Sequence, residues 1–219
     1  MLQRLLVLAA LFLSSSFAFA QDSTPGTAQD YQAGRDYFPI EPAQPTASGD
    51  KIEVIEVFGY PCIHCANAAP VIAEWRKGLA PDVQLSFMPA VFGGIWEIYA
   101  RVFYAAETMG VMERTHERLF EVLHTERRPI ASVEDIATFY AEYGVSKEQF
   151  LATIESFPVG AKVANATRQV PLYQVEATPT IVVNGKYRVL APGGEDGYQK
   201  MLQVVDFLVA KERAAKVAG

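Results

Sequence analysis

The sequence has little cysteine, little histidine and no excess of positive charge. Its 219 residues include 2 cysteines and 3 histidines, and 19 basic residues stand against 25 acidic ones. Two cysteines cannot supply the disulfide framework that holds many small secreted domains together. The formal net charge of −6 argues against nucleic acid as a partner, because such binding depends on neutralising phosphates. An apolar fraction of 50 % predicts instead a globular chain with a real hydrophobic core.

The beginning of the chain carries a distinct apolar run. Arg4 precedes an apolar segment over 5–13, and Ala18-Phe19-Ala20 comes before polar residues. This is the pattern of a secretory signal peptide cleaved after Ala20. The segment is shorter than the roughly 20 residues of a membrane span, which disfavours an uncleaved anchor. We therefore expect a soluble mature protein in an oxidising compartment, which is the periplasm if the cell is Gram-negative.

Both cysteines lie in one short stretch. Cys62 and Cys65 enclose the dipeptide Ile63-His64; they follow a β-branched and aromatic run over 52–58 and precede a segment rich in helix formers over 66–79. The pair is therefore predicted at the start of a helix that leaves a strand. In that context a Cys-x-x-Cys pair indicates a thioredoxin-like redox site.

A structural disulfide and a zinc site are the alternatives for this pair. So small a ring would constrain little of the unfolded chain, which disfavours a purely structural role. Structural zinc takes four ligands, and besides His64 only His116 and His124 remain. Those two are eight residues apart on one predicted helix that also carries several glutamates, so we expect a solvated helix face there and no metal site.

The chain then divides by pattern into an arm, a sheet and helices. Residues 21–50, with prolines at four positions, are predicted to form a mobile arm with a possible edge strand over 35–38. Residues 51–94 predict a strand over 51–59, a helix over 62–78 and a strand over 83–91. Pro70 lies inside that helix and is expected to kink it.

The second half predicts an insertion of helices followed by more sheet. Residues 95–175 show helical patterns throughout, including a capping box that begins at Ser146 and a last helix over 160–169 that Pro171 should kink or end. Residues 176–219 predict a hairpin around a two-residue Asn184-Gly185 turn and a terminal amphipathic helix over 197–216.

This order of elements resembles the DsbA family of bacterial thiol:disulfide oxidoreductases. The resemblance covers nearly all of the expected mature chain, and it rests on Cys62-Ile63-His64-Cys65 after a strand and on Ala177-Thr178-Pro179-Thr180 before the hairpin. It implies an α/β fold, a thioredoxin domain over 51–94 and 176–219 with an all-helical domain inserted over 95–175. It also implies that the Thr178-Pro179 bond is cis and faces the redox pair, although cis bonds are a minority even before proline.

The chemistry of the pair can be argued from position. Cys62 is expected to be the nucleophile, because free N–H groups and the helix dipole at a helix start favour thiolate. Cys65, one turn inside, should be shielded and should resolve mixed disulfides. His64 can donate a hydrogen bond to the Cys62 sulfur or place positive charge near it. The cofactor is then the redox-active disulfide itself, with no metal.

Three positions depart from the family pattern and affect how far the family's function can be assigned to this chain. Ile63 stands where the familiar form of the dipeptide has proline, and Thr178 stands where the best-known oxidases have valine, as in disulfide isomerases. Glu56 matches the family's buried acid, but Phe87 occupies the position where its lysine partner would align. Glu56 is therefore either a proton acceptor with a raised pKa or an exposed strand residue.

The resemblance implies an enzyme that oxidises cysteine pairs of unfolded or newly exported proteins. A quinone-linked (DsbB-like) membrane partner would reoxidise it, and the enzyme is expected to be a monomer. Phe92, Ile95, Trp96 and Tyr99 are candidates for an apolar substrate groove, against the simpler expectation that they pack in the core. The alternatives are an isomerase or reductase, which usually carries an extra N-terminal dimerisation domain, and a non-catalytic chaperone, which the intact cysteine pair makes a weak candidate.

Overall fold

The computed structural model describes residues 31–130 and 132–218. The signal peptide predicted over 1–20 therefore lies outside the described residues. Residues 31–219 form one compact unit. Among the described residues, no helix combines the length and the apolar character that crossing a membrane requires.

A single mixed sheet of five strands forms the centre of this unit. The strands are β1 (Phe38–Pro39), β2 (Ile52–Phe58), β3 (Val83–Pro89), β4 (Thr180–Val183) and β5 (Tyr187–Leu190). Their order across the sheet is β1-β5-β4-β2-β3. The β2–β3 pair is parallel and the other pairs are antiparallel. A parallel pair needs a crossover, and helix α1 (Ile63–Arg76) supplies it.

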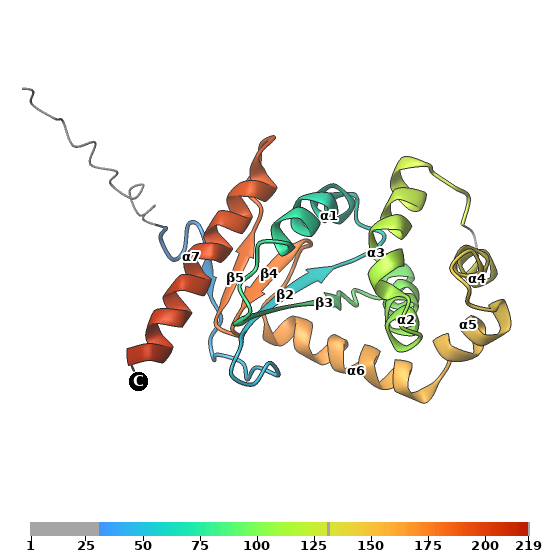
Figure 1. The fold of residues 1–219 in the computed structure, drawn as a ribbon, viewed down its shortest axis with the longest axis horizontal. Helices are drawn as coiled ribbons and strands as arrows, with labels where there is room; N and C mark the ends of the chain where they lie inside the picture. Colours follow the sequence, from blue (N-terminus) through green and yellow to red (C-terminus); the bar gives the residue numbers. More distant parts are fainter. Residues whose placement is uncertain (1–30, 131, 219) are drawn as a thin grey trace, which may run out of the picture. The chain divides into compact units, whose positions relative to one another are not determined.

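The remaining helices cover the sheet or form the insertion. They are α2 (Ile95–Thr108), α3 (Met112–Phe120), the π-helical turn η1 (Glu121–Thr125), α4 (Val133–Ala141), α5 (Lys147–Ile154), α6 (Phe157–Leu172) and α7 (Gly197–Ala218). Helices α1 and α7 pack on one face of the sheet, and the end of α6 packs on the other. In Figure 1, α2 to α5 lie to one side of the sheet.

Helices on both faces explain the composition of the central strand β2. Successive side chains of a strand point to opposite faces. Val54 lies in the core with α1 and α7, whereas Ile55 and Val57 lie in the core with α6. All seven residues of β2 are consequently buried, the two glutamates included. Glu56 has the same parity as Val54, so its side chain lies under α1.

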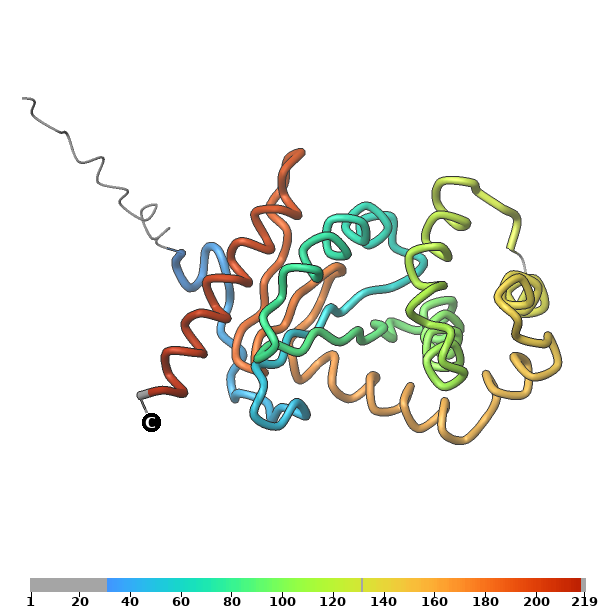
Figure 2. Tube along the Cα trace, in the orientation of Figure 1, coloured from blue at the N-terminus to red at the C-terminus, as the bar shows by residue number. Residues whose placement is uncertain are grey.

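The helical insertion leaves the sheet after β3 and returns through α6, as the trace in Figure 2 shows. The predicted capping box is present at Ser146, and Ser132 forms a second one at the start of α4. Helix α6 begins at Phe157, earlier than predicted, and ends one residue after Pro171. Helix α1 continues through Pro70.

The edge strand predicted in the N-terminal arm is present as β1, at Phe38–Pro39, whereas the predicted mobility of the arm and the two-residue turn differ from the structure. The described part of the predicted arm is attached to the sheet: β1 pairs with β5, and the Gln44 N–H donates to the Gly185 carbonyl at 2.9 Å. The turn contains three residues, because Val183 pairs with Tyr187. Asn184 and Gly185 both have positive φ, and a Cβ at Gly185 would collide with the Gln44 carbonyl. The attached segment thus requires glycine at that position.

Candidate functional site

The pair of cysteines sits at the junction of β2 and α1. Cys62 is the residue just before the first residue of α1, and no side chain caps the helix there. The first N–H groups of a helix have no partner inside it and carry partial positive charge. The chain reaches Cys62 through a turn, which is closed by a hydrogen bond from the Cys62 N–H to the Gly59 carbonyl at 3.0 Å. The sulfur is thereby held beside the positive end of the helix.

The surroundings of the Cys62 sulfur favour its thiolate. Both cysteines are free thiols in the structure. Hydrogen bonding to the Cys65 thiol, and secondarily to the Thr178 side chain and to the N–H groups of Cys65 and His64, lowers the pKa of Cys62 to about 5 against an opposing effect of burial. In the thiol form, the Cys62 sulfur donates to the Thr178 carbonyl at 3.4 Å instead. When Cys62 ionises, its sulfur therefore stops donating to the Thr178 carbonyl and accepts hydrogen bonds from several donors.

Cys65 behaves in the opposite way. It is fully buried on the inner face of α1. Burial, followed by its hydrogen bond to Cys62, raises the pKa of the Cys65 thiol. A group that is shielded and protonated cannot compete with Cys62 as the attacking sulfur at neutral pH.

An open hollow beside the pair brings in residues from the far end of the chain. The Thr178-Pro179 peptide bond is cis, as predicted. Both residues line a hollow of about 360 Å³ together with His64 and Tyr198. No sequence pattern pointed to Tyr198. The structure connects it to the pair, since burial and then the negative charge of the Cys62 sulfur raise the pKa of its phenol.

Glu56 is the second perturbed acid of the site. Of the two alternatives left open for it, the exposed strand residue is excluded, because Glu56 is only 1 % exposed. Burial raises the pKa of its carboxyl to about 8. Among the described residues its Oε1 atom finds no hydrogen-bond partner. Phe87 lies opposite it in the β2–β3 register, so the neighbouring strand offers no charge there.

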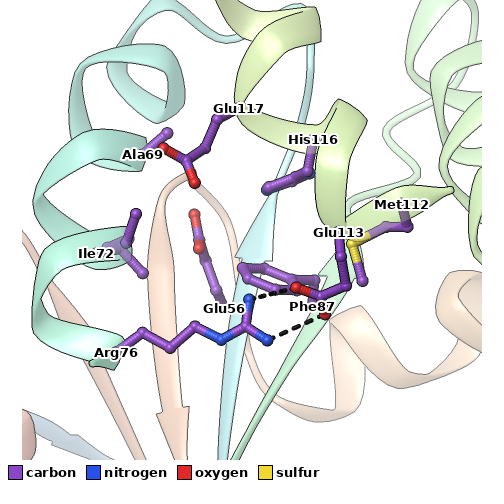
Figure 3. Close-up of a pocket in the computed structure, with 10 residues that line it drawn as sticks. Glu56, Ala69, Ile72, Arg76, Phe87, Met112, Glu113, His116 and Glu117 are labelled. Atoms are coloured by element: carbon purple, nitrogen blue, oxygen red, sulfur yellow. Dashed lines mark hydrogen bonds and ion pairs between the residues drawn. The ribbon is translucent and has the colours of Figure 1, made fainter. Parts of the chain in front are cut away.

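Figure 3 shows the pocket into which the Glu56 carboxyl points. The pocket lies between α1 and α3, with Ala69 and Glu117 among the residues that line it, and has a volume of about 20 Å³, room for one water molecule. The nearby Arg76 is already engaged, because its guanidinium donates to both oxygens of Glu113 at 2.8 and 3.0 Å. The carboxyl of Glu56 thus lies beneath α1 without a cation of its own.

The candidate groove residues divide into two groups. Phe92 and Ile95 are 44 % and 56 % exposed, and Ile98, one turn further along α2, is 42 % exposed although the sequence gave no reason to select it. Tyr99 is buried in the core. Trp96 is half-buried, and its ring packs at a tilt against Phe92, with ring centroids 5.0 Å apart. It also covers the backbone of Gly59 so closely that a Cβ there would collide with the indole. The apolar patch of Phe92, Ile95, Trp96 and Ile98 is thus continuous with the loop that leads to Cys62.

The prediction of a solvated face at His116 and His124 is wrong. His116 is buried, and burial lowers the pKa of its imidazole to about 3. Its Nδ1 atom lies 3.0 Å from the Tyr60 hydroxyl, and the Nε2 atom of His124 lies 2.7 Å from the Tyr60 carbonyl oxygen. Their common partner is 56 and 64 residues away in the sequence, so no local pattern could indicate it.

Comparisons with known proteins agree with this arrangement. The family model described as the DSBA-like thioredoxin domain matches residues 82–205. The thiol:disulfide interchange protein DsbA of Pseudomonas aeruginosa is 39 % identical over 214 residues, which cover 98 % of this chain and 99 % of the relative. The protein of the same name from Pseudomonas syringae pv. tomato is 38 % identical over 218 residues, which cover 100 % of both. A crystal structure of Pseudomonas aeruginosa DsbA superposes with a TM-score of 0.80 at 41 % identity, covering 86 % of this chain and 98 % of the other. The predicted fold class, a thioredoxin fold with inserted helices, is confirmed.

Proposed function

Because the chain belongs to the DsbA-like thioredoxin family and is a thiol:disulfide oxidoreductase, we propose that it acts as an oxidase that donates a Cys62–Cys65 disulfide to cysteine pairs of exported proteins. The observation that carries this direction of transfer is the position of the Cys62 sulfur at the start of α1, where its pKa falls to about 5. Each unit of such a fall favours the reduced pair by about 1.4 kcal/mol at neutral pH. That is about 30 mV toward oxidant for a two-electron couple.

The reaction proceeds in two exchanges. A substrate thiolate attacks the Cys62 sulfur, a mixed disulfide forms, and the Cys62–Cys65 bond breaks with its electron pair on Cys65, which takes up a proton. A second substrate thiolate then attacks the substrate sulfur of the mixed disulfide, and Cys62 leaves as a thiolate. The substrate dithiol is oxidised by two electrons and the enzyme pair is reduced. Cys65 resolves unproductive complexes by attacking the mixed disulfide in the reverse sense.

Glu56 is the proton donor and acceptor for Cys65 in this scheme. With a pKa of about 8 it is mostly protonated at neutral pH. Ala69, which lines its pocket, lies one helical turn beyond Cys65 on the buried face of α1. The pocket has room for one water molecule to carry the proton along that face.

The substrate occupies the surface around the pair. Thr178 and Pro179 lie beside Cys62 and contact the substrate chain next to its reacting cysteine. The apolar patch of Phe92, Ile95, Trp96 and Ile98 binds unfolded segments, whose exposed apolar side chains have no core to enter. This assignment is supported by the exposure of Phe92, Ile95 and Ile98 at the edge of the active-site loop.

The compartment and the source of oxidising equivalents follow from the same reaction. Disulfides persist in oxidising compartments, so the protein acts in the periplasm after its signal peptide is cleaved at Ala20. A quinone-linked membrane protein of the DsbB type reoxidises the Cys62–Cys65 dithiol. The pair is the only redox group that the reaction requires.

Thr178 favours a second candidate function, disulfide isomerisation or reduction. Thr178 stands before the cis-proline, where disulfide isomerases also have threonine, and its hydroxyl helps to keep Cys62 as the thiolate that would attack an existing disulfide. The reduction potential of the wild-type pair separates a disulfide donor from a reductant. After equilibration with glutathione, an oxidase is expected nearer to the value of about −120 mV that characterises DsbA itself than to about −270 mV of thioredoxin. A potential at or below the thioredoxin value would rule out the oxidase.

A further inference from the structure

Tyr60, two residues before Cys62, is held at both of its polar groups by the helical insertion. Its hydroxyl contacts His116 of α3, and its backbone carbonyl contacts His124 of η1. Its ring is buried to 1 % exposure and packs against Phe120 with centroids 5.0 Å apart. Tyr60 is thereby the residue of the active-site loop that is embedded in the insertion.

The chemistry of the contact with the Tyr60 carbonyl determines which nitrogen of His124 carries the hydrogen. A carbonyl oxygen only accepts, so the His124 Nε2 atom must carry the hydrogen and donate across the 2.7 Å contact. His116 is neutral at physiological pH, since its pKa is about 3. Burial raises the pKa of the Tyr60 phenol, so the phenol stays protonated, and its hydroxyl lies 3.0 Å from Nδ1 of His116. The contact with His124 therefore has a donor and an acceptor defined by the carbonyl.

The π-helical turn explains how both histidines reach one residue. Residues eight apart in an α-helix differ by about 80° around the axis. The hydrogen bonds of η1 span five residues, and this wider turn rotates each residue less about the axis. His124 is brought round to the side that carries His116. Such irregular turns are frequent at functional sites.

We propose that His124 is a positioning residue for Cys62: by donating to the Tyr60 carbonyl it fixes the loop that holds the sulfur at the start of α1. The loop from Gly59 to Cys62 closes on itself through the Cys62 N–H and the Gly59 carbonyl, and Tyr60 lies inside this turn. Trp96 covers Gly59, so the turn is braced at Gly59 and at Tyr60. Without the bond from His124, the sulfur would sample positions farther from the donors of Cys65 and Thr178.

This inference rests on the proposed role of Cys62 as the ionised, attacking sulfur. The test is the ultraviolet thiolate titration of reduced full-length protein for wild type, His124→Leu, His124→Gln and Glu121→Gln. Leucine removes the donor, and glutamine places an amide N–H near the position of Nε2. Glu121 lies on the same turn, is exposed, and pairs with Arg118 on its own helix, so its variant is the matched control.

The expected result is an upward shift of the Cys62 pKa by about 1 unit in the leucine variant, with the glutamine and control variants close to wild type. The equilibrium with glutathione should move about tenfold toward the reduced glutathione side, which corresponds to about 30 mV. A folded leucine variant with an unshifted pKa would overturn the inference, and so would a glutamine variant that shifts as far as leucine.

Two further outcomes keep the result interpretable. A wild-type pKa near the free-cysteine value of about 8.5 would overturn the proposed function itself, whereas a low wild-type value with unshifted variants overturns only the role of His124. If the leucine variant does not fold, nitrogen NMR of the wild-type histidines decides. An Nε2–H tautomer of His124 with a slowly exchanging proton is expected, and an Nδ1–H tautomer would contradict the inference.

Discussion

Glu56, near the end of β2, and Cys62, at the start of α1, are only six residues apart, yet their pKa values are shifted in opposite directions. The Glu56 carboxyl has a pKa raised to about 8, and the Cys62 thiol has a pKa lowered to about 5. Glu56 is buried with an oxygen that forms no hydrogen bond to any described residue, whereas Cys62 is partly exposed and surrounded by donors. Hydrogen-bond donors, more than proximity to a helix, decide which acid ionises.

The same comparison applies within the pair. Cys62 and Cys65 share one helix, yet the buried member keeps its proton. The consequence for stability has a definite sign. A group whose pKa is lower in the folded than in the unfolded state stabilises the fold above its unfolded pKa, and the effect is lost as the pH falls through the folded value. The reduced enzyme is therefore stabilised at neutral pH through Cys62, and the disulfide form lacks this contribution.

The largest expected effect comes from separating the two sulfurs. In Cys65→Ser the attacking thiolate remains and the resolving thiol is gone, so mixed disulfides with substrate proteins should accumulate. In Cys62→Ser no mixed disulfide should form. Non-reducing electrophoresis followed by mass spectrometry checks both. Equal accumulation in the two variants would mean that the sulfurs are equivalent, which their burial contradicts.

Glu56→Gln tests the other half of the comparison. The folded-state pKa of Glu56 is raised, so its contribution to stability is full below about 4.5 and is lost as the pH rises to about 8. Each unit is about 1.4 kcal/mol, and the variant should therefore gain on the order of 2–3 kcal/mol of unfolding free energy relative to wild type on going from pH 4 to pH 7.

Urea unfolding at several pH values measures this relative gain. Glu117→Gln is the matched control, because Glu117 lines the same pocket but is exposed. Parallel pH profiles for wild type and Glu56→Gln would show that the buried carboxyl is ionised after all. In the exchange reaction, the glutamine variant should also slow the step that protonates Cys65.

His64→Ala should make the enzyme less oxidising. The imidazole lines the hollow beside the pair, and a hydrogen bond to an ionised acceptor such as a thiolate is roughly twice as strong as one between neutral groups. We expect a rise of about 1 unit in the Cys62 pKa and a fall of about 30 mV in potential. Glutathione equilibration measures the potential, and an unchanged or higher value would exclude the role of His64.

Thr178→Val should have the smallest effect. It removes the hydroxyl that donates to the Cys62 thiolate but keeps the backbone carbonyl that accepts from the thiol. A hydrogen bond from this neutral donor contributes about 1 kcal/mol, so the Cys62 pKa should rise by about 0.7 unit. A shift larger than that of His64→Ala would reverse the order of the two donors.

The local features of the site were predictable from the sequence. Cys62 at a helix start and the capping box at Ser146 follow from short-range rules, and both are present. The cis Thr178-Pro179 bond is also present, but it was expected from the family resemblance and not from any local rule. The burial of Glu56 was not decided, because a central strand covered on both faces shows no alternation between apolar and polar residues.

Long-range contacts account for what the sequence analysis missed. His116 and His124 lie among several glutamates, which is typical of a solvated helix face. Their partner Tyr60, however, lies in the loop that follows β2. Tyr198 reaches the pair from α7, more than a hundred residues after Cys65. Contacts of this kind depend on how the helices pack on the sheet, and no periodicity within either segment encodes them.

The thiolate titration of reduced wild-type protein tests the central claim most directly, since the proposed oxidase depends on an ionised Cys62 at neutral pH. The ultraviolet absorbance of the thiolate is followed against pH, with Cys62→Ser as the blank. The account predicts a single transition with a midpoint near pH 5, as set by the donors around Cys62. A midpoint near 8.5, the value of an unperturbed cysteine, would contradict it.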